Sequence, residues 1–343
     1  MSSRHSRHRF FPGIGDDGQE KLARSRVAVV GCGALGSRIA ELLGRAGIAT
    51  SADGVLRLID RDYVETSNLQ RQALFDTADA EAALPKATAA RDHLLAIDPA
   101  IRCEAFVRDL SPSNAIQLLS AVDLILDGTD NFRTRFLLND VSIRTRTPWI
   151  YGGAVASRGA VAAFTPFEGP CFRCLLESMP ALGLGDTCET AGVITPLPAL
   201  VASLQVALAM RFLVSGELPR GLRLFDLWES PYEGRTVFAR TPAAPACRSC
   251  GSLELPALSS DPQELVTLCG RNSVQVSRNE EPDLDRAEAR LRMAGSDIRR
   301  NPHSLTLKIP EGSLTCFVDG RIIVEGTTDP AEATSLISRY LGD

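Results

Sequence analysis

Several features typical of exported and nucleic-acid-binding proteins are absent from this sequence. The 343 residues carry a net charge of −5, whereas nucleic-acid-binding proteins usually show a basic bias. The opening stretch, MSSRHSRHRFF, is charged and has no apolar core, so it does not have the form of a signal peptide. We therefore expect a cytoplasmic location and no nucleic-acid partner.

Long hydrophobic runs are lacking as well. The most apolar stretch, residues 199–214, is interrupted by Ser203, Gln205 and Arg211. It also falls short of the roughly 20 apolar residues that a helix needs to span a bilayer. We expect a buried helix there and no membrane association.

Histidine is scarce, because the chain has only His5, His8, His93 and His303. None of them lies near the cysteine pairs described below, and none stands out as a general base. The nine cysteines of a cytoplasmic protein are expected to be thiols or metal ligands rather than disulfides.

Short apolar runs and helical patterns alternate through the first half of the chain. Runs of strand length cover 26–32, 55–60, 101–109, 123–130 and 149–155, and helical patterns cover 36–46, 85–97 and 133–145. This alternation predicts an α/β fold with a doubly wound, Rossmann-like parallel sheet. Two later runs, 159–166 and 222–229, are expected to extend that sheet with antiparallel strands.

A stretch rich in Pro, Ala and Ser, residues 241–264, indicates a domain boundary. We expect a first domain of residues 1–255 and an accessory domain of residues 256–343. Strand-like runs, a hairpin around Asp319-Gly320 and a final helical pattern predict that the second domain is small and α+β. Its sequence indicates no role for it.

Three glycines, Gly31, Gly33 and Gly36, stand in the G-x-G-x-x-G spacing directly after the first predicted strand. Glycines at these positions permit a tight turn whose backbone N–H groups approach a phosphate. Asp60 ends the second predicted strand, where an acidic residue normally holds a ribose. The pattern predicts a nucleotide site, and the alternative is a tight turn without a ligand.

Cations follow Asp60 where a nicotinamide site would not need them. Asn68, Arg71 and Lys86 can each donate hydrogen bonds to phosphate oxygens, and such charge-assisted bonds contribute roughly 1.5–3 kcal/mol each. A triphosphate carries more negative charge than the pyrophosphate of NAD, so two cations in one crevice favour ATP. The alternative is that Arg71 and Lys86 are solvated surface charges.

The fourth predicted strand ends in a polar turn, residues 127–131. Asp130 is well placed to hold Mg²⁺, which prefers one or two carboxylates together with substrate phosphates. Asn131 and Arg135 are candidates for further contacts. The alternative for Asp130 is that its carboxylate caps the following helix.

Two C-x₂-C pairs, CFRC at 171–174 and CRSC at 247–250, indicate a metal site. Four thiolates that leave no open position fit a tetrahedral, structural zinc site. The predicted ligands are Cys171, Cys174, Cys247 and Cys250. The alternative is a set of four unrelated buried thiols.

Cys188 lies in a polar stretch that bears glycine and threonine, just before the apolar run. A cysteine in such a loop is a candidate nucleophile when its thiolate is favoured by a nearby helix N-terminus or cation, and otherwise it is a spare thiol. Cys269, near Arg271, is the weaker candidate of the two.

Taken together, these motifs resemble the MoeB/ThiF/HesA family, the bacterial relatives of ubiquitin-activating enzymes. The stretches that carry the resemblance cover roughly residues 4–251 and are RHSRH, GCGALG, LIDRDYVETSNLQRQ, PKATAARD, DGTDNFRTR, CFRC, TCETAGVITP, ASLQ and CRSC. Ala34 stands where the family usually has a second glycine. Because only its backbone N–H is needed, alanine should serve if its φ is negative.

The resemblance implies an adenylyltransferase with the cofactors ATP, Mg²⁺ and Zn²⁺. Its substrate would be the C-terminal glycine of a ubiquitin-like sulfur-carrier protein ending in Gly-Gly, with release of pyrophosphate and a possible later thiol or sulfur transfer. Arg7 would reach into the neighbouring subunit's site, which implies a homodimer with composite active sites. Cys188 matches a family cysteine that becomes linked to the carrier in some members.

The same resemblance assigns roles within the nucleotide site. Asp60 would bind the ribose, Asp130 the magnesium ion, and Asn68, Arg71 and Lys86 the phosphates. The full set expected at the nucleotide is Gly31, Gly33, Ala34, Gly36, Asp60, Asp62, Ser67, Asn68, Arg71, Lys86, Asp130, Asn131 and Arg135. The residues expected in catalysis are Arg7, Arg71, Lys86, Asp130 and Cys188.

Two other functions stay open on the sequence. One is an NAD-dependent oxidoreductase, which the cations and the lack of a catalytic histidine disfavour. The other is a catalytically silent partner that docks a ubiquitin-like protein. The sequence does not identify the carrier or its pathway, and it does not decide between Cys188 and Cys269.

Overall fold

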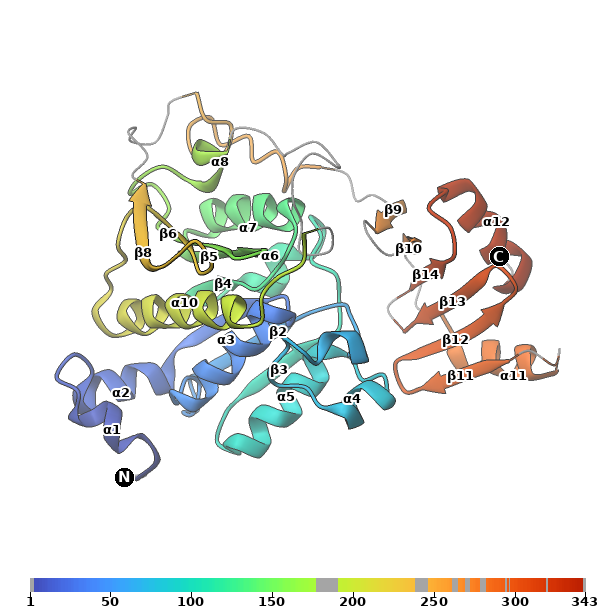
Figure 1. Cartoon of the computed structure of the whole chain (residues 1–343), viewed down its shortest axis with the longest axis horizontal. Helices are drawn as coiled ribbons and strands as arrows, with labels where there is room; N and C mark the ends of the chain where they lie inside the picture. Colours follow the sequence, from blue (N-terminus) through green and yellow to red (C-terminus); the bar gives the residue numbers. More distant parts are fainter. Residues whose placement is uncertain are drawn as a thin grey trace. The chain divides into compact units, whose positions relative to one another are not determined.

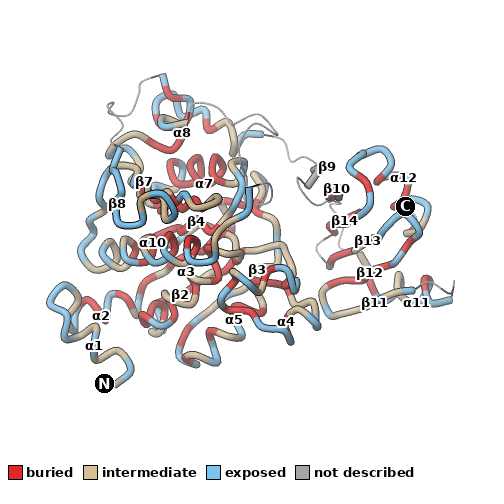
Figure 2. Tube along the Cα trace, viewed as in Figure 1, coloured by how far each residue is buried: buried red, intermediate tan, exposed pale blue. Residues whose placement is uncertain are grey.

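The computed structural model describes residues 3–176, 191–237, 246–260, 265–268, 272–277, 282–293, 295, 297–318 and 320–341. The chain divides into two compact units, residues 1–260 and residues 261–343. Each unit has its own sheet and its own core (Figures 1 and 2).

An eight-stranded sheet forms the centre of the first unit, with the order β3-β2-β1-β4-β5-β6-β7-β8. In this order the first five strands, β3, β2, β1, β4 and β5, pair in parallel. Strands β6, β7 and β8 then continue the sheet in antiparallel pairs. The α/β fold class predicted from the sequence is therefore confirmed. The strands are β1 (Arg26–Val30), β2 (Val55–Ile59), β3 (Cys103–Phe106), β4 (Leu124–Asp127), β5 (Trp149–Val155), β6 (Arg158–Phe164), β7 (Leu222–Asp226) and β8 (Ser230–Val237).

Alternate residues of β1 enter two different cores. Val27 and Val29 pack with the helices α3 (Ala34–Arg45), α5 (Lys86–Ile97) and α10 (Pro196–Ser215). Ala28 and Val30 pack with α6 (Ala115–Leu119) and α7 (Phe132–Thr145) on the other face. This alternation is what a strand covered on both sides requires, because successive side chains point to opposite faces.

Helix α10 lies beside α3 on the sheet (Figure 1). By length and composition alone it could cross a membrane, with a mean hydropathy of 1.8 over its most apolar window, 39% of which is buried. Leu197, Val201, Ala202 and Val206 are buried in the core of the first unit. The apolar run thus forms a helix that packs on the sheet, but only one side of it is buried, whereas the sequence predicted a buried helix.

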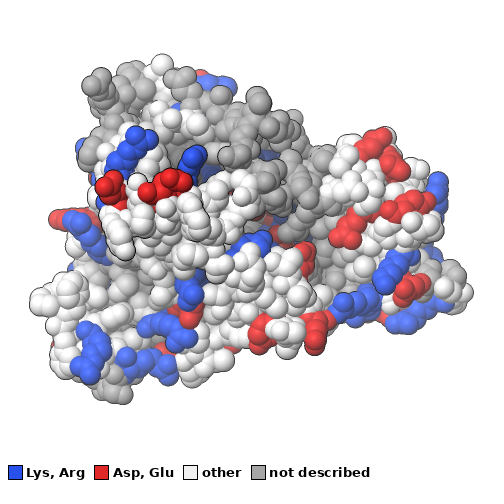
Figure 3. Space-filling view, viewed as in Figure 1, with Lys and Arg blue, Asp and Glu red and all other residues white. Residues whose placement is uncertain are grey.

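Shorter elements complete the first unit. They are η1 (Ser3–His5), α1 (Ser6–Phe10), α2 (Gly15–Arg24), η2 (Thr66–Asn68), α4 (Thr77–Glu81) and α8 (Phe172–Leu175). Basic and acidic side chains are interspersed over the face of the molecule shown in Figure 3.

In its described residues the second unit is a six-stranded antiparallel sheet with two helices, as expected for a small α+β domain. The strand order is β11-β12-β13-β14-β10-β9. Val274, Leu305, Leu314 and Val324 are buried in its core together with Leu336 of the last helix. The elements are β9 (Leu265–Leu268), β10 (Ser273–Ser277), α11 (Leu284–Met293), β11 (Ile298–Asn301), β12 (Ser304–Ile309), β13 (Gly312–Phe317), β14 (Arg321–Glu325) and α12 (Pro330–Leu341).

Candidate functional site

The glycine turn joins β1 directly to α3. Gly31 has a φ of +84°, a conformation that favours glycine. A Cβ on Gly36 would lie 1.7 Å from the carbonyl oxygen of Gly31, so the first turn of α3 packs directly against the glycine turn. Ala34 begins α3 and is not among the residues with positive φ, so the condition for alanine at this position is met. The N-terminus of α3 therefore lies directly at the glycine turn, and helix N-termini are generally able to bind anions.

Asp60 ties the end of β2 to the glycine turn. Its Oδ2 accepts a hydrogen bond from the backbone N–H of Cys32 (2.5 Å), and its Oδ1 accepts one from that of Asp62 (2.6 Å). Burial raises the pKa of the Asp60 carboxyl, and the nearby charge of Lys86 opposes that shift. The acid is thus fixed in place at the strand end, where the sequence predicted a ribose ligand.

Lys86 begins α5 and is only 3% exposed. Its Nζ lies 3.3 Å from Oδ2 of Asp62, and its backbone N–H donates to the carbonyl of Asp62 (2.8 Å). A solvated surface charge, the alternative considered for Lys86, does not fit this burial. The structure instead gathers a buried cation with Asp60 and Asp62 beside the glycine turn.

The segment after Asp60 is held by its own side chains. The side chain of Asn68 is buried, and its Oδ1 accepts from the backbone N–H of Glu65 at 3.4 Å in a capping box. Ser67 is exposed and donates its hydroxyl to Glu65 (3.2 Å). One guanidinium nitrogen of Arg71 donates to the carbonyl of Ser67 (2.9 Å). These contacts fix the segment that carries the predicted phosphate ligands.

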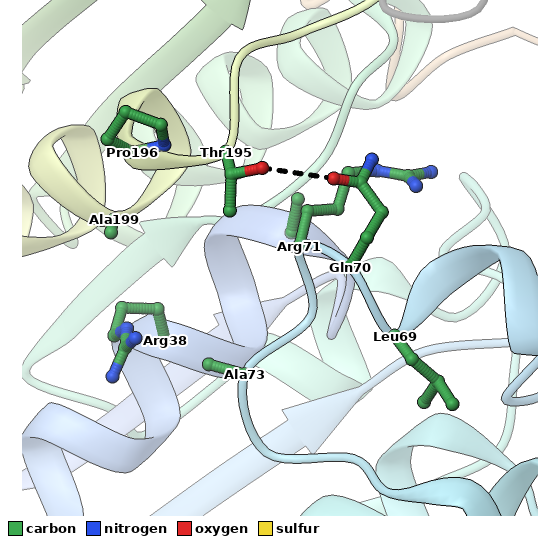
Figure 4. Close-up of a pocket in the computed structure, with 9 residues that line it drawn as sticks. Arg38, Leu69, Gln70, Arg71, Ala73, Thr195, Pro196 and Ala199 are labelled. Carbon is green, nitrogen blue, oxygen red and sulfur yellow. Dashed lines mark hydrogen bonds between the residues drawn. The ribbon is translucent and has the colours of Figure 1, made fainter.

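A pocket of about 340 Å³ lies next to this segment. Ala34, at the start of α3, and Arg71 both line it, which brings two predicted site residues to one cavity. Figure 4 shows Thr195, before α10, donating a hydrogen bond to Gln70 (3.1 Å) across it. Arg38, one turn along α3 from Ala34, also lines the pocket and was missed from the sequence. Its position four residues after Ala34 was the available signal, because such residues share a helix face.

The turn after β4 has a buried acid as its base. The Asp127 carboxylate is fully buried and accepts from the backbone N–H (2.9 Å) and hydroxyl (2.6 Å) of Thr129 and from Nε of Arg135 (3.0 Å). Burial raises the pKa of the Asp127 carboxyl, and the charge of Arg135 opposes that rise. Asp130, three residues on, is exposed. The turn therefore presents one carboxylate outward while it anchors the other in the core.

Asn131 in this turn and Arg135 on α7, both candidates for further nucleotide contacts, make hydrogen bonds within the protein. Asn131 caps α7, because its side-chain oxygen accepts from the backbone N–H of Thr134 (2.8 Å), so the alternative in which Asp130 is the cap is wrong. Arg135 is only 6% exposed, and besides Asp127 its guanidinium donates to the carbonyls of Thr129 (2.7 Å) and Gly152 (3.1 Å). Its predicted contact with the nucleotide stays a prediction.

The four cysteines of the two C-x₂-C pairs converge. The Sγ–Sγ distances are 3.8 Å for Cys171–Cys174, 3.7 Å for Cys171–Cys247 and 3.4 Å for Cys174–Cys250. The four Sγ atoms all lie within 4.8 Å of one another, so the alternative of unrelated thiols is wrong. Four sulfur ligands in such a group fit tetrahedral Zn²⁺. Burial raises the pKa of Cys171, and it raises the pKa of Cys250 to about 12. Burial also opposes ionisation of Cys247, but backbone N–H groups of Cys250 and Ser249 lower its pKa to about 7, so Cys247 is the thiol of these three that ionises most readily.

A second group of metal-ligating side chains, Asp76, Asp79 and His93, has a simpler explanation. Asp76 and Asp79 form the capping box of α4. His93 Nε2 lies 2.7 Å from Asp79 Oδ2. The group is accounted for as a helix cap with a histidine hydrogen-bonded to it.

Three predicted residues are not brought to the site by the described part of the chain. Arg7 lies on α1 in an exposed position. Cys188 and Cys269 lie outside the described residues.

Comparison with known proteins agrees with this geometry. A model of the ThiF family matches residues 5–249. The chain is 39% identical over 345 residues to a sulfur carrier protein ThiS adenylyltransferase of Bacillus subtilis, and the match covers 100% of both chains. It is 38% identical over 251 residues to a sulfur carrier protein adenylyltransferase of Thermus thermophilus, covering 71% of this chain and 90% of that protein.

Among solved structures, E. coli MccB in complex with MccA-N7isoASN resembles this chain with a TM-score of 0.62. The two are 20% identical, and the match covers 73% of this chain and 75% of that one. At this identity the likeness shows a shared fold.

Proposed function

Because the chain belongs to the ThiF family, we propose that it activates the C-terminal glycine of a ubiquitin-like sulfur-carrier protein by adenylation with ATP. The observation that carries this proposal is the full-length similarity to an adenylyltransferase of a sulfur carrier, joined with the buried cation beside the glycine turn. The chain is an enzyme of the adenylyltransferase class. The other two functions considered from the sequence gain no support from any contact described above.

The reaction needs alignment and charge neutralisation more than acid–base chemistry. A carboxylate is already ionised at neutral pH, so the terminal carboxylate of the carrier needs no general base. Its oxygen attacks the α-phosphorus of ATP, an acyl–phosphate bond forms, and the bond to the β-phosphate oxygen breaks as pyrophosphate leaves. The protein lowers the barrier by holding the reactants in line and by placing positive charge where negative charge develops.

The nucleotide-binding roles follow the positions of the side chains. Asp60, fixed between β2 and the glycine turn, would bind the ribose, since each carboxylate oxygen retains a second lone pair. Lys86, Asn68 and Arg71 would bind the phosphates, aided by the backbone N–H groups at the start of α3. Lys86 would exchange part of its contact with Asp62 for a phosphate oxygen.

Asp130 would hold a magnesium ion between the protein and the phosphates. Asp130 is exposed, whereas the carboxylate of Asp127 is buried and accepts hydrogen bonds from Thr129 and Arg135. Asp130 is therefore the carboxylate of this turn that has access to a ligand. When bound, the ion would neutralise charge on the phosphate oxygens.

The four cysteines would hold zinc in a purely structural site, because four sulfur ligands leave no position for a substrate. The site joins the segment around α8, which follows β6, to residues 246–260 at the end of the first unit. Its function would be to stabilise that connection.

Two further proposals, a shared active site and a covalent link to the carrier, rest on the family resemblance alone. The protein would be a homodimer in which Arg7 of one subunit completes the site of the other. Cys188 would form a covalent link to the carrier after adenylation. The expected cytoplasmic location also stays a prediction.

A carrier-dependent exchange of radiolabelled pyrophosphate into ATP tests the function. We expect exchange with a carrier ending in Gly-Gly and none when the two glycines are deleted. Absence of exchange with every such carrier encoded in the source genome, in protein that binds ATP, would contradict the proposed reaction.

A further inference from the structure

Strands β4 and β5 separate next to the turn that carries Asp130. Their parallel pairing covers only Ile125–Trp149 and Leu126–Ile150. Beyond Leu126 the chain continues into Asp127 and the turn that ends at Asp130. Where two central strands separate, their buried backbone carbonyls still need hydrogen-bond donors, and the ladder no longer supplies them.

Gln205 supplies donors from one face of the sheet. It lies on α10 and is fully buried. Its Nε2 donates to the carbonyl of Asp127 on β4 (2.8 Å) and to that of Ile150 on β5 (3.3 Å). One side-chain amide therefore bridges the two strands where their ladder ends.

Arg135 supplies donors from the other face. It lies on α7, and one of its guanidinium nitrogens donates to the carbonyls of Thr129 (2.7 Å) and Gly152 (3.1 Å). Its Nε donates to the side chain of Asp127 (3.0 Å). Gln205 and Arg135 thus hold the turn between β4 and α7 from opposite sides.

The position of Gln205 imposes two structural constraints, one on its own side chain and one at Gly152. The Oε1 atom of Gln205 is buried and has no hydrogen-bond partner within the described part of the chain, which is an unfavourable state for a carbonyl group. A Cβ on Gly152 would lie 2.4 Å from that same Oε1, so glycine leaves the space that the amide occupies. An apolar residue at position 205 would avoid the unpaired oxygen but would remove the donors to both strands.

We propose that Gln205 and Arg135 are positioning residues that fix the turn after β4 and thereby set the place of the Asp130 carboxylate. The inference rests on the proposed function, in which Asp130 faces the nucleotide. Neither side chain needs to touch the substrate for this role. Displacement of a catalytic group by about 1 Å is enough to reduce a rate by about 100-fold.

The test uses two variants that disturb the bridge in different ways. Gln205→Met keeps a side chain of similar length but has no donor, and Gly152→Ala retains Gln205 while pushing its amide aside. In the folded fraction of each variant we expect the KM for ATP in pyrophosphate exchange to rise about tenfold or the kcat to fall by a similar factor. We also expect faster amide hydrogen exchange at residues 128–130. Ser203→Ala, at an exposed position of α10, is the matched control and should change neither quantity.

A double variant separates positioning from general destabilisation. If both changes act through the same bridge, Gln205→Met combined with Gly152→Ala should lose little more activity than Gln205→Met alone. A lower melting temperature with unchanged KM, kcat and hydrogen exchange at 128–130 would mean that the bridge only stabilises the core, and would overturn the inference. Hydrogen exchange needs no carrier protein. If the wild-type protein catalysed no pyrophosphate exchange, the proposed reaction would fail. Faster hydrogen exchange at residues 128–130 in the variants would still support the positioning role.

Discussion

At the scale of single residues, the proposed nucleotide site contains one buried ammonium group, that of Lys86. Lys86 is paired with Asp62 and lies in the electrostatic field of Asp60. A buried charge is tolerated when it has opposite charges as neighbours, and removal of one partner leaves the others uncompensated. The charge of Lys86 therefore affects the stability of this region and is also expected to bind phosphate.

Replacement of Lys86 by methionine should lower kcat/KM for ATP by about 10- to 100-fold, because it removes a charge-assisted hydrogen bond to phosphate worth roughly 1.5–3 kcal/mol. Pyrophosphate exchange at varied ATP concentration measures the effect. Lys308→Met, which removes an exposed lysine in the second unit, is the control. Wild-type kinetics in Lys86→Met would mean that Lys86 has a purely structural role.

Replacement by asparagine should have different effects at the two acids of the turn after β4. It should change the Mg²⁺ dependence of the rate at Asp130 and the stability of the protein at Asp127. Asp130→Asn should weaken the dependence of the rate on Mg²⁺ and leave the melting temperature near that of the wild type, because Asp130 is exposed. Asp127→Asn should lower the melting temperature, because it removes a buried charge that pairs with Arg135. Mg²⁺ titrations and thermal melting distinguish the two outcomes. An equal loss of stability in both variants would contradict the assignment of roles.

The residues found from the sequence are those whose chemistry restricts the residue type. Gly31 needs a positive φ, and the cysteine pairs have metal-ligand spacing, so both carry a local signal. Gln205, by contrast, acts on strands that are 78 and 55 residues away in the chain. No pattern along the sequence indicates which buried polar residue meets the carbonyls of separating strands. Arg135 had the expected charge, but no local pattern indicated that it would pair with Asp127 inside the protein.

At the scale of secondary structure, α7 connects the two chemical sites. Its first residues follow the turn with Asp130, and further along the helix Asn139 and Asp140 contact both cysteine pairs. Asn139 accepts from the backbone N–H of Phe172 (2.9 Å) in the first pair. The fully buried Asp140 accepts from the hydroxyl of Ser249 in the second pair and from the backbone N–H of Ala257 (2.7 Å). Through these hydrogen bonds α7 holds the segments of both cysteine pairs beside it.

Asp140→Asn should therefore weaken the zinc site without altering a ligand. An amide group offers one acceptor oxygen where the carboxylate offered two, so one of the donors loses its partner. We expect faster zinc loss to a chelator and a lower melting temperature, with the zinc-free wild-type protein as the reference. Asp92→Asn, at an exposed position on α5, is the control. Unchanged zinc retention in Asp140→Asn would show that the hydrogen bonds to Asp140 are not needed to hold the metal.

Elements were predictable from sequence where burial imposes a pattern. The runs that became β1, β2 and β4 are mostly apolar because both faces of the parallel sheet are covered, and Arg57 is the one charged residue inside these strands rather than at an end. Strand β8 was missed because its residues are almost all exposed, so no hydrophobic alternation marks it. Its place is set by backbone pairing with β7, which is a tertiary contact.

At the scale of the whole molecule, the chain combines a widely shared unit with an additional one. The match to the Thermus thermophilus relative covers 71% of this chain, whereas the match to the Bacillus subtilis relative covers all of it. The second unit has its own core of buried apolar residues. Every residue assigned here to nucleotide or zinc binding lies in the first unit, so we expect that unit to function without the other.

Truncation at two neighbouring positions tests this expectation and locates the functional boundary. The backbone N–H of Ala257 donates to Asp140, and Leu258 packs against the cysteine cluster, so residues 256–260 contribute to the first unit. A chain ending at Ser260 should bind ATP with wild-type affinity and retain zinc. A chain ending at Leu255, the boundary inferred from composition, should lose zinc faster and melt at a lower temperature, since Asp140 then lacks a donor. Calorimetry of ATP binding, zinc analysis and thermal melting measure these quantities. Loss of ATP binding in the chain ending at Ser260 would mean that the second unit takes part in building the nucleotide site.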